Sequence, residues 1–264
     1  VVSIAADIVP ITGENRVLAH YGLQQLNENP RIGLKALMEV SDRDKSFTIS
    51  DVVFGLAPRI NAVGRIEHGA KAVELMVQED IEFARAKAQA VNQHNLKRRE
   101  LDQSITEEAL QMIVTDAKST VVFHPDWHKG VVGIVASRLI ESHYRPTIVL
   151  TENNGKLAGS ARSVKGFDVY DAIDACSKYV EQFGGHKYAA GLTLKKENLE
   201  AFTAKFESVV AETIQDEMLI PQVSIDAVLN LANIDHKLYR ILRQMAPFGP
   251  GNMSPVFMSK QVVD

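Results

Sequence analysis

The sequence predicts an α/β protein whose helical first part leads through one long helix into a region of alternating strands and helices. Residues 80–114 contain neither Gly nor Pro, as expected of a single long helix. Between residues 119 and 229, β-branched apolar runs alternate with helix-like apolar patterns, which indicates a mainly parallel or mixed sheet covered by helices. A further strand is expected at residues 255–258, after a segment rich in Gly and Pro.

Composition limits the class of protein. Of the 264 residues, 45% are hydrophobic and 23% are charged, which is ordinary for a globular protein with a sizeable core. The single cysteine, Cys176, excludes a disulfide framework and a four-cysteine zinc site within the chain. We find no signal-peptide pattern and no apolar run of membrane-spanning length, so we expect a cytoplasmic protein without membrane contact. Since the chain opens on Val1 and ends near a strand, we expect it to be part of a longer protein.

The net charge of −4 gives no overall argument for nucleic-acid binding. Residues 127–167, however, contain six Lys or Arg and only two Glu, a local charge of +4. Local basic stripes of this kind contact phosphates. The alternative is a solvated face whose acidic partners lie elsewhere in the chain.

The first part opens on an apolar run, residues 1–6, which we interpret as a buried strand. Asp7 follows it directly, where an α/β sheet presents side chains to ligands. Its carboxylate is suited either to a divalent metal or to capping the helix that begins near residues 13–16.

Three helices are expected next. Two are amphipathic, at residues 17–26 and 32–40, and the third opens at Thr48, whose side chain and that of Asp51 fit a capping box. It ends at residues 57–66, which we interpret as a loop-prone segment.

That segment carries Arg59 and Arg65. One guanidinium group can donate two hydrogen bonds to the oxygens of a phosphate, so both arginines are candidate substrate-binding residues. The alternative is that both pair with carboxylates of neighbouring helices.

The long helix has a narrow apolar stripe that is interrupted at Asn95 and Arg98. Such a helix is typical of a connector between two lobes rather than of a core. We interpret the basic residues 97–99 as a solvated face.

The alternating region after the helix supplies the rest of the elements. Strands are expected at residues 119–123, 146–151, 156–163, 190–194 and 223–229, and helices at residues 131–142, 170–183 and 199–214.

The loop at residues 124–130 contains two histidines at i, i+4 spacing, His124 and His128. Pro125 between them excludes a helical zinc pair. His128, just ahead of Lys129 and a helix start, is placed to meet an anion or a sugar hydroxyl.

Ser160 and Arg162 lie two residues apart on an expected strand, so their side chains share one face. A hydroxyl and a guanidinium beside Gly159 form a candidate phosphate clamp. An exposed edge strand that merely carries an arginine is the alternative.

Gly184 and Gly185 precede His186, in what we interpret as a helix-to-strand turn. Paired glycines permit positive φ and the close approach of another group, and the histidine can donate or accept a hydrogen bond. The alternative is an ordinary turn with a surface histidine.

Taken together, these motifs resemble the RecJ family of single-strand-specific 5′-to-3′ exonucleases, which belong to the DHH phosphoesterases. The matching stretches are residues 6–10 with 13–16, residues 58–65, residues 128–138, residues 184–191 and residues 247–252, in the family's order. The resemblance implies four segments: residues 1–79 as the end of a DHH domain, residues 80–116 as a connecting helix, residues 117–220 as a DHH-associated substrate-binding domain, and residues 221–264 as a linker with the start of an OB-fold domain.

The resemblance also implies roles for particular residues. The family uses two Mn²⁺ or Mg²⁺ ions to hydrolyse phosphodiesters, and Asp7 matches one metal ligand. Ser160 and Arg162 match the strand associated with the 5′ phosphate of single-stranded DNA. Arg65, or less favourably Arg59, would join them, and Gly185 with His186 would face the scissile phosphate, His186 in a catalytic role.

The chain contains no Asp-His-His triplet. Because Asp7 alone cannot assemble a two-metal site, we expect this chain to be inactive by itself. The resemblance implies a role in DNA repair and recombination, with a helicase or a single-strand-binding protein as a possible partner.

Other readings compete with this one. A related DHH-type oligonucleotide or cyclic-dinucleotide phosphodiesterase would share the residues around His186. Such a shorter enzyme, however, would lack the third domain that we expect to begin after residue 247. A non-catalytic module that binds single strands would need more aromatic residues than the 6% present. An editing-type domain like that of alanyl-tRNA synthetases leaves Asp7 unexplained.

Overall fold

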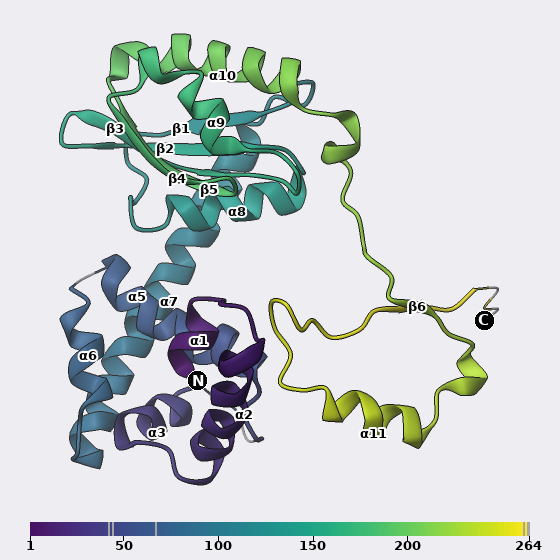
Figure 1. The fold of residues 1–264 in the computed structure, drawn as a ribbon. Helices are drawn as coiled ribbons and strands as arrows, with labels where there is room; N and C mark the ends of the chain where they lie inside the picture. Colours follow the sequence, from purple (N-terminus) through teal and green to yellow (C-terminus); the bar gives the residue numbers. More distant parts are fainter. Residues whose placement is uncertain (42, 44, 67, 261, 263–264) are drawn as a thin grey trace. The chain divides into compact units, whose positions relative to one another are not determined.

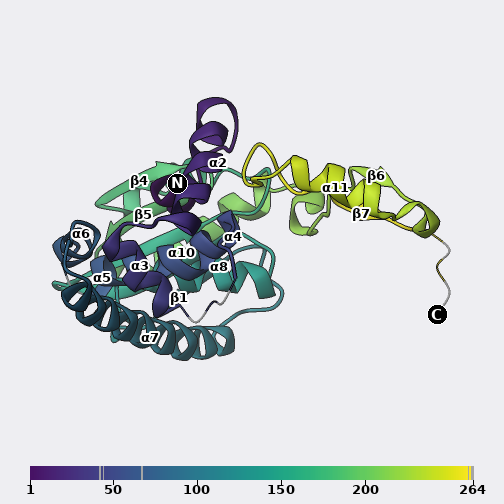
Figure 2. The same cartoon turned by 90° about the horizontal axis from the view of Figure 1, so that it is seen from below.

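The computed structural model describes residues 1–41, 43, 45–66, 68–260 and 262, and it divides into two compact units (Figure 1). The first unit comprises residues 1–96 and 223–264, and the second comprises residues 97–222. The division falls inside one long helix, α7 (Ile81–Gln111), which confirms the helix expected from the sequence. Figure 2 shows α7 as one uninterrupted helix.

The two ends of α7 pack into different cores. Ala84 and Ala88 are buried among the helices of the first unit, whereas Ile105 and Ala109 are buried in the second. The polar interruption of the stripe at Asn95 therefore lies next to the division between the units. A connecting helix needs one apolar face for each core, and the sequence of α7 provides two such faces in succession.

The first unit is helical. Its elements before α7 are α1 (Val2–Ala6), α2 (Gly13–Glu28), α3 (Ile32–Glu39), α4 (Ile49–Asp51), the π-helical turn η1 (Val52–Leu56), α5 (Ala57–Ile66) and α6 (Ala70–Met76). Leu37, Leu56 and Leu75 are fully buried in the core between them. The helices expected at residues 17–26 and 32–40 are confirmed as α2 and α3.

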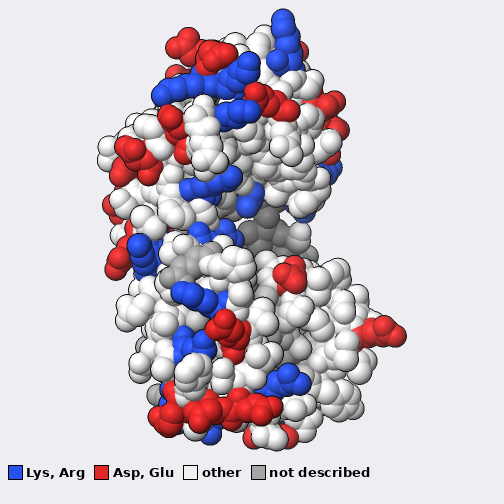
Figure 3. All heavy atoms as spheres, turned by 90° about the vertical axis from the view of Figure 1, so that its left-hand side faces the viewer, with Lys and Arg blue, Asp and Glu red and all other residues white. Residues whose placement is uncertain are grey.

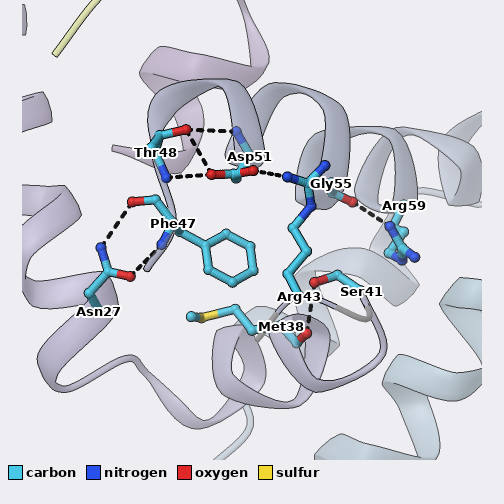
Figure 4. Close-up of polar contacts among 9 residues, drawn as sticks. All are labelled: Asn27, Met38, Ser41, Arg43, Phe47, Thr48, Asp51, Gly55 and Arg59. Carbon is cyan, nitrogen blue, oxygen red and sulfur yellow. Dashed lines mark hydrogen bonds and ion pairs between the residues drawn. The ribbon is translucent and has the colours of Figure 1, made fainter. Parts of the chain in front are cut away.

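The entry to α4 is held by two sets of polar contacts (Figure 4). The Asn27 side chain donates to the carbonyl of Phe47 at 3.0 Å and accepts from its N–H at 2.7 Å. The Thr48 N–H donates to Asp51 Oδ2 at 2.9 Å, and the Asp51 N–H donates to Thr48 Oγ1 at 3.3 Å. The expected capping box is confirmed, and Arg43 adds an ion pair to the Asp51 carboxylate.

Two expectations for the first unit are wrong. Residues 1–6 form the helix α1 and not a strand, and only Ala5 of this run is fully buried. A short apolar run fits a helix or a strand equally well when no longer periodicity is present. Residues 57–66 form α5 rather than a loop, because Pro58 stands in its first turn, where a missing N–H is tolerated after the π-helical turn.

The second unit is built on a five-stranded sheet in the order β1-β2-β3-β5-β4. Its strands are β1 (Thr120–Phe123), β2 (Thr147–Asn153), β3 (Lys156–Arg162), β4 (Gln182–His186) and β5 (Ala189–Leu194). Only the β1–β2 pair is parallel, and the other three pairs are antiparallel. The expected mixed sheet is confirmed.

Helices cover both faces of this sheet (Figure 1). On one face, Ile148 and Leu157 are buried with Phe202 of α10 (Leu199–Thr213), beside the short helix α9 (Val169–Asp174). On the other face, Val149 is buried with Leu139 of α8 (Val132–Ser142) and with the second half of α7. Alternate residues of β2 thus enter different cores.

The helix expected at residues 170–183 is only partly present. It ends at Asp174, and a 3₁₀ turn, η2 (Ser177–Tyr179), leads into the edge strand β4. Gly184 and Gly185 therefore lie inside a strand, and the helix-to-strand turn expected there is wrong. The chain turns instead at Lys187 and Tyr188, between β4 and β5.

Residues 223–264 return to the first unit. They contain η5 (Leu231–Asn233), the helix α11 (His236–Gln244) and a two-residue parallel pair, β6 (Ala227–Val228) with β7 (Phe257–Met258); the short turns η3 (Lys196–Asn198) and η4 (Asp216–Leu219) precede them. The Ile11 N–H donates to the Pro250 carbonyl at 2.6 Å, and Arg16 Nη2 donates to the Met245 carbonyl at 2.9 Å. Of the strands expected at residues 223–229 and 255–258, only the two-residue strands β6 and β7 are present.

The outer edge of the sheet at β1 carries a polar cap. The Glu207 carboxylate on α10 accepts from the N–H groups of Lys118 and Ser119, both at 2.8 Å, and from the Ser119 hydroxyl at 2.5 Å.

Within the described part of the chain, no helix is both long enough and apolar enough to cross a membrane.

Candidate functional site

The sheet of the second unit brings four of the predicted residues onto one face. Directly paired residues of neighbouring strands share a face, and so do residues two apart on one strand. The two rows formed in this way across β3, β5 and β4 are Ser160–Gly191–Gly184 and Arg162–Ala189–His186. Both rows lie on the face covered by α8, opposite the α10 core.

Ser160 and Arg162 are in direct contact. Arg162 Nη1 donates to Ser160 Oγ at 2.7 Å and to the Ala161 carbonyl at 2.8 Å, and both side chains are half-buried. These bonds fix the guanidinium over the end of β3 next to the hydroxyl. A positive group and a hydroxyl held together at a partly open surface suit a phosphate.

The first turn of α8 packs against this pair. A Cβ atom placed on Gly133 would lie 2.9 Å from Arg162 Nη2 and 3.0 Å from Ser160 Oγ. The sequence interpretation did not single out Gly133 as a site residue. It lies within the family-like stretch 128–138 and two residues after the start of an amphipathic helix, and neither signal tells what the helix packs against.

Glycines form the surface between Ser160 and the edge of the sheet. Gly191 and Gly184, which continue the row of Ser160, are exposed and present bare backbone on this face. Gly185 has a φ of +152°, and a Cβ there would lie 2.2 Å from the Ala189 carbonyl oxygen. Only glycine fits that position, and the result is a shallow floor that a ligand can approach closely.

His186 and His128 are oriented in the same manner. His186 Nδ1 accepts the N–H of Tyr188 at 3.2 Å, and His128 Nδ1 accepts the N–H of Gly130 at 3.0 Å. In the neutral ring this places the proton on Nε2, which becomes a donor. His186 is exposed at the end of β4, and His128 is half-buried in the loop that enters α8.

The remaining predicted residues, Asp7, Arg59 and Arg65, belong to the first unit. Arg59 uses all three guanidinium nitrogens: Nε donates to Asn92 Oδ1 at 2.9 Å, Nη1 to the Gly55 carbonyl at 2.7 Å and Nη2 to the Val40 carbonyl at 3.1 Å (Figure 4 shows the Gly55 bond). These contacts link α5 to η1, α7 and the end of α3. Arg65 is exposed in the last turn of α5.

Asp7 is the exposed C-cap residue of α1. The N-cap of α2 is Thr12, so the alternative that Asp7 caps this helix is wrong. Among the described residues, no three His, Cys, Asp or Glu side chains are grouped so that they could hold a metal ion. Asp7 therefore supplies at most one ligand, and the residues described do not fit a complete metal site.

In the described part of the structure, two of the six cations in the basic segment pair with carboxylates, and a third is buried. Arg138 pairs with Asp102 at 2.8 Å and Lys156 with Glu181 at 2.7 Å, while Arg145 is buried, bonded to Thr120 and to three backbone carbonyls. Burial lowers the pKa of Arg145. The acidic partners of Arg138 and Lys156 thus lie outside residues 127–167, as the alternative interpretation of this segment expects.

Charged side chains are unevenly spread over the surface. On the face drawn in Figure 3, Asp and Glu form a band at the lower edge, and acidic and basic side chains are intermixed over the rest of the face. Cys176 is buried in the α10 core, and burial raises the pKa of its thiol to about 11, which excludes it as a nucleophile at neutral pH.

Two domain families match parts of this chain. The DHHA1 domain matches residues 110–212, and the RecJ OB domain matches residues 225–264. The first match contains the strands and helices that carry Ser160, Arg162 and His186.

Curated relatives from several bacteria are named as the exonuclease RecJ. The single-stranded-DNA-specific exonuclease RecJ of Bacillus subtilis is 37% identical over 264 residues, which cover 98% of this chain and 34% of that protein. RecJ of Escherichia coli is 34% identical over 266 residues, which cover 96% of this chain and 46% of that protein. The chain thus spans between a third and a half of the length of these curated relatives.

A solved structure has the same fold. The crystal structure of RecJ in complex with Mn²⁺ from Thermus thermophilus matches 98% of this chain, and 38% of its own chain, with a TM-score of 0.90 and 30% identity. The order of the two matched domains agrees with the motif order in the sequence. This chain belongs to the RecJ family.

Proposed function

We propose that this chain is the substrate-holding part of a 5′-to-3′ single-stranded-DNA exonuclease, a metal-dependent hydrolase that acts in DNA repair and recombination in the cytoplasm. The proposal keeps the four segments drawn from the sequence, with residues 117–220 as the substrate-binding domain. The observation that carries it is the joint placement of Ser160, Arg162 and His186 around a floor of glycines.

Ser160 and Arg162 are proposed to bind the 5′ phosphate of the strand. A terminal phosphate monoester carries more negative charge than an internal diester and offers three terminal oxygens. The Arg162 guanidinium can meet two of these oxygens, and the Ser160 hydroxyl can donate to the third. A 5′-hydroxyl end offers neither the charge nor the acceptors.

His186 is proposed to contact the next phosphate along the strand. Its Nε2 proton is available as a donor because Nδ1 accepts the Tyr188 N–H. Gly184 and Gly185 would let the strand lie close to β4. His128 is proposed to meet a sugar hydroxyl or phosphate, and Arg65 is proposed as a further substrate-binding residue.

Similar proteins were solved with Mg²⁺ and with Mn²⁺, and we propose a divalent metal of this kind for the enzyme. Such a metal lowers the pKa of a bound water molecule and stabilises charge on the leaving oxygen. Of the described residues, Asp7 is assigned to it as one ligand. A helicase that opens the duplex, or a protein that coats the single strand, is the partner that would present the substrate.

The RecJ OB match at residues 225–264 favours this function over a shorter DHH-type phosphodiesterase for cyclic dinucleotides or oligonucleotides. A phosphodiesterase that acts on small substrates has no use for an OB domain, whereas a strand that extends past the active site needs further binding surface.

Replacing Arg162 with Ala tests the proposal. We expect binding of a 5′-phosphorylated oligothymidine to weaken roughly 10- to 100-fold, as for the loss of hydrogen bonds to a charged group, with little change for the 5′-hydroxyl oligomer. Fluorescence anisotropy with both oligomers measures the ratio. Lys165→Ala, which removes an exposed cation after β3, is the matched control. Equal losses on both oligomers for Arg162→Ala would contradict the proposed phosphate contact.

A further inference from the structure

The first turn of α8 lies unusually close to the Ser160–Arg162 pair. A Cβ on Gly133 would meet Arg162 Nη2 at 2.9 Å, Ser160 Oγ at 3.0 Å and Ser160 Cβ at 3.5 Å. A contact below 3.0 Å forces one of the two groups to shift, one of 3.0–3.4 Å requires a shift of a few tenths of an ångström, and one of 3.5 Å is ordinary. The space that a methyl group on residue 133 would need is therefore occupied by the guanidinium of Arg162 and the hydroxyl of Ser160.

The backbone of Gly133 does not explain why glycine stands there. The residue is the second of α8 and is helical. Glycine in a helix costs about 0.5–1 kcal/mol relative to Ala, so a helical position with no other demand favours Ala. Gly64 in α5 is a helical glycine of the other kind, since a Cβ there meets no atom of the described residues within 4 Å.

Gly133 also lies in the first turn of α8, where the first backbone N–H groups are not bonded within the helix. The N–H of Ile134 donates to the carbonyl of Val131, the N-cap residue, at 2.8 Å. Val132 and Gly133 come before Ile134 in the first turn, where the N–H groups have no acceptor within the helix. Donors at a helix start favour a negative group nearby. They add to the guanidinium and the hydroxyl, which Gly133 allows to lie against the helix.

We infer that Gly133 is a positioning residue that sets the enzyme's preference for a 5′-phosphorylated end. It acts through Arg162 and Ser160: without a side chain at residue 133, both groups lie against the start of α8 and converge on one phosphate. This inference rests on the proposed function of that pair. A methyl group at residue 133 would displace the guanidinium and the hydroxyl and leave the backbone in place, because both are mobile ends of side chains.

The test is Gly133→Ala, measured by anisotropy with 5′-phosphorylated and 5′-hydroxyl oligothymidine of equal length. We expect the preference for the phosphorylated oligomer to fall about tenfold, the effect of one charge-assisted hydrogen bond, with binding of the hydroxyl oligomer unchanged. A merely structural role would weaken both to the same degree, and this result would overturn the inference. Gly64→Ala adds a methyl group to a helix in open space and should leave both affinities unchanged.

A double variant separates the inference from the proposed function. In an Arg162→Ala background, Gly133→Ala should change the preference much less than in the wild type. A wild-type chain that does not distinguish the oligomers would refute the phosphate contact and the inference with it. If the wild type distinguishes them and Gly133→Ala does so equally well, only the inference fails. Loss of folded circular dichroism in Gly133→Ala would also overturn it, because the methyl group would then be meeting backbone.

Discussion

At the scale of single residues, the adjacent glycines of β4 are held by different constraints. Nothing lies within 4 Å of a Cβ built on Gly184, and its φ is not in the left-handed region. Gly185 has a φ of +152°, and its Cβ would lie 2.2 Å from the Ala189 carbonyl oxygen and 2.6 Å from Ala190 Cα. Both obstacles are backbone atoms of β5, which cannot move without breaking the strand pair.

Gly185→Ala should therefore destabilise the protein and Gly184→Ala should not. Backbone strain of this kind costs about 1–3 kcal/mol, and the collision with β5 adds to it. Urea unfolding followed by circular dichroism measures the difference, with Gly184→Ala as the matched control. Equal free energies of unfolding for the two variants would show that the left-handed geometry of Gly185 is not required.

Residue-scale prediction from sequence succeeded where the cause was local. Ser160 and Arg162 share a face because alternation along one strand decides it. The contacts of Arg59 with Asn92 and Val40, and the closeness of Gly133 to Arg162, depend on residues about 20 to 30 positions away. No pattern around Arg59 or Gly133 contains that information, so tertiary packing had to supply it.

At the scale of elements, one buried carboxylate ties α7 to α8. The Asp102 side chain is fully buried, and its Oδ2 lies 2.8 Å from Arg138 Nη2 on α8 and 3.5 Å from Arg98 Nη1 on α7. Arg98, expected on a solvated face, is instead mostly buried, with 13% of its side chain exposed. The apolar stripe missed it because a buried ion pair leaves no hydrophobic signal in the sequence.

Asp102→Ala should lower the free energy of unfolding by about 1–3 kcal/mol, since the mostly buried Arg98 loses a charged partner while the half-exposed Arg138 stays in contact with solvent. Glu39→Ala, which breaks an exposed pair with Arg85, is the control and should cost no more than about 1 kcal/mol. Thermal and urea unfolding of both variants provide the comparison. An Asp102→Ala protein as stable as the control would mean that the interior pair contributes nothing net.

Element prediction failed mainly at β4. The apolar pattern of residues 170–183 suits one helix, but it is divided between α9, a 3₁₀ turn and a strand in which Phe183 packs on the α10 core. Gly184 and Gly185 argued against a strand, because glycine weakens strands in general. The pairing of β4 with β5 outweighs that local preference.

At the scale of the whole molecule, the predicted residues are divided between two units. Ser160, Arg162, His128 and His186 lie in residues 97–222, whereas Asp7 and Arg65 lie in residues 1–96. Hydrolysis with two metal ions requires several oxygen ligands around them. The described residues offer no group of three candidate ligands.

We therefore expect this chain, purified alone, to bind single-stranded oligonucleotides without degrading them. Release of mononucleotides in the presence of Mn²⁺ is the measurement, with anisotropy on the same preparation as the control for folding. Manganese-dependent release that persists at constant specific activity through further purification would contradict the assignment of Asp7 as an isolated ligand.

The cap at the outer edge of β1 has a consequence for self-association. An edge strand presents unpaired N–H and C=O groups with which a strand of another molecule can pair. Here the N–H groups of Lys118 and Ser119, which lead into β1, already donate to the Glu207 carboxylate. A strand arriving from another molecule would have to displace a charged acceptor before it could extend the sheet. One glutamate on α10 thus occupies the backbone donors at which an added strand would begin to pair.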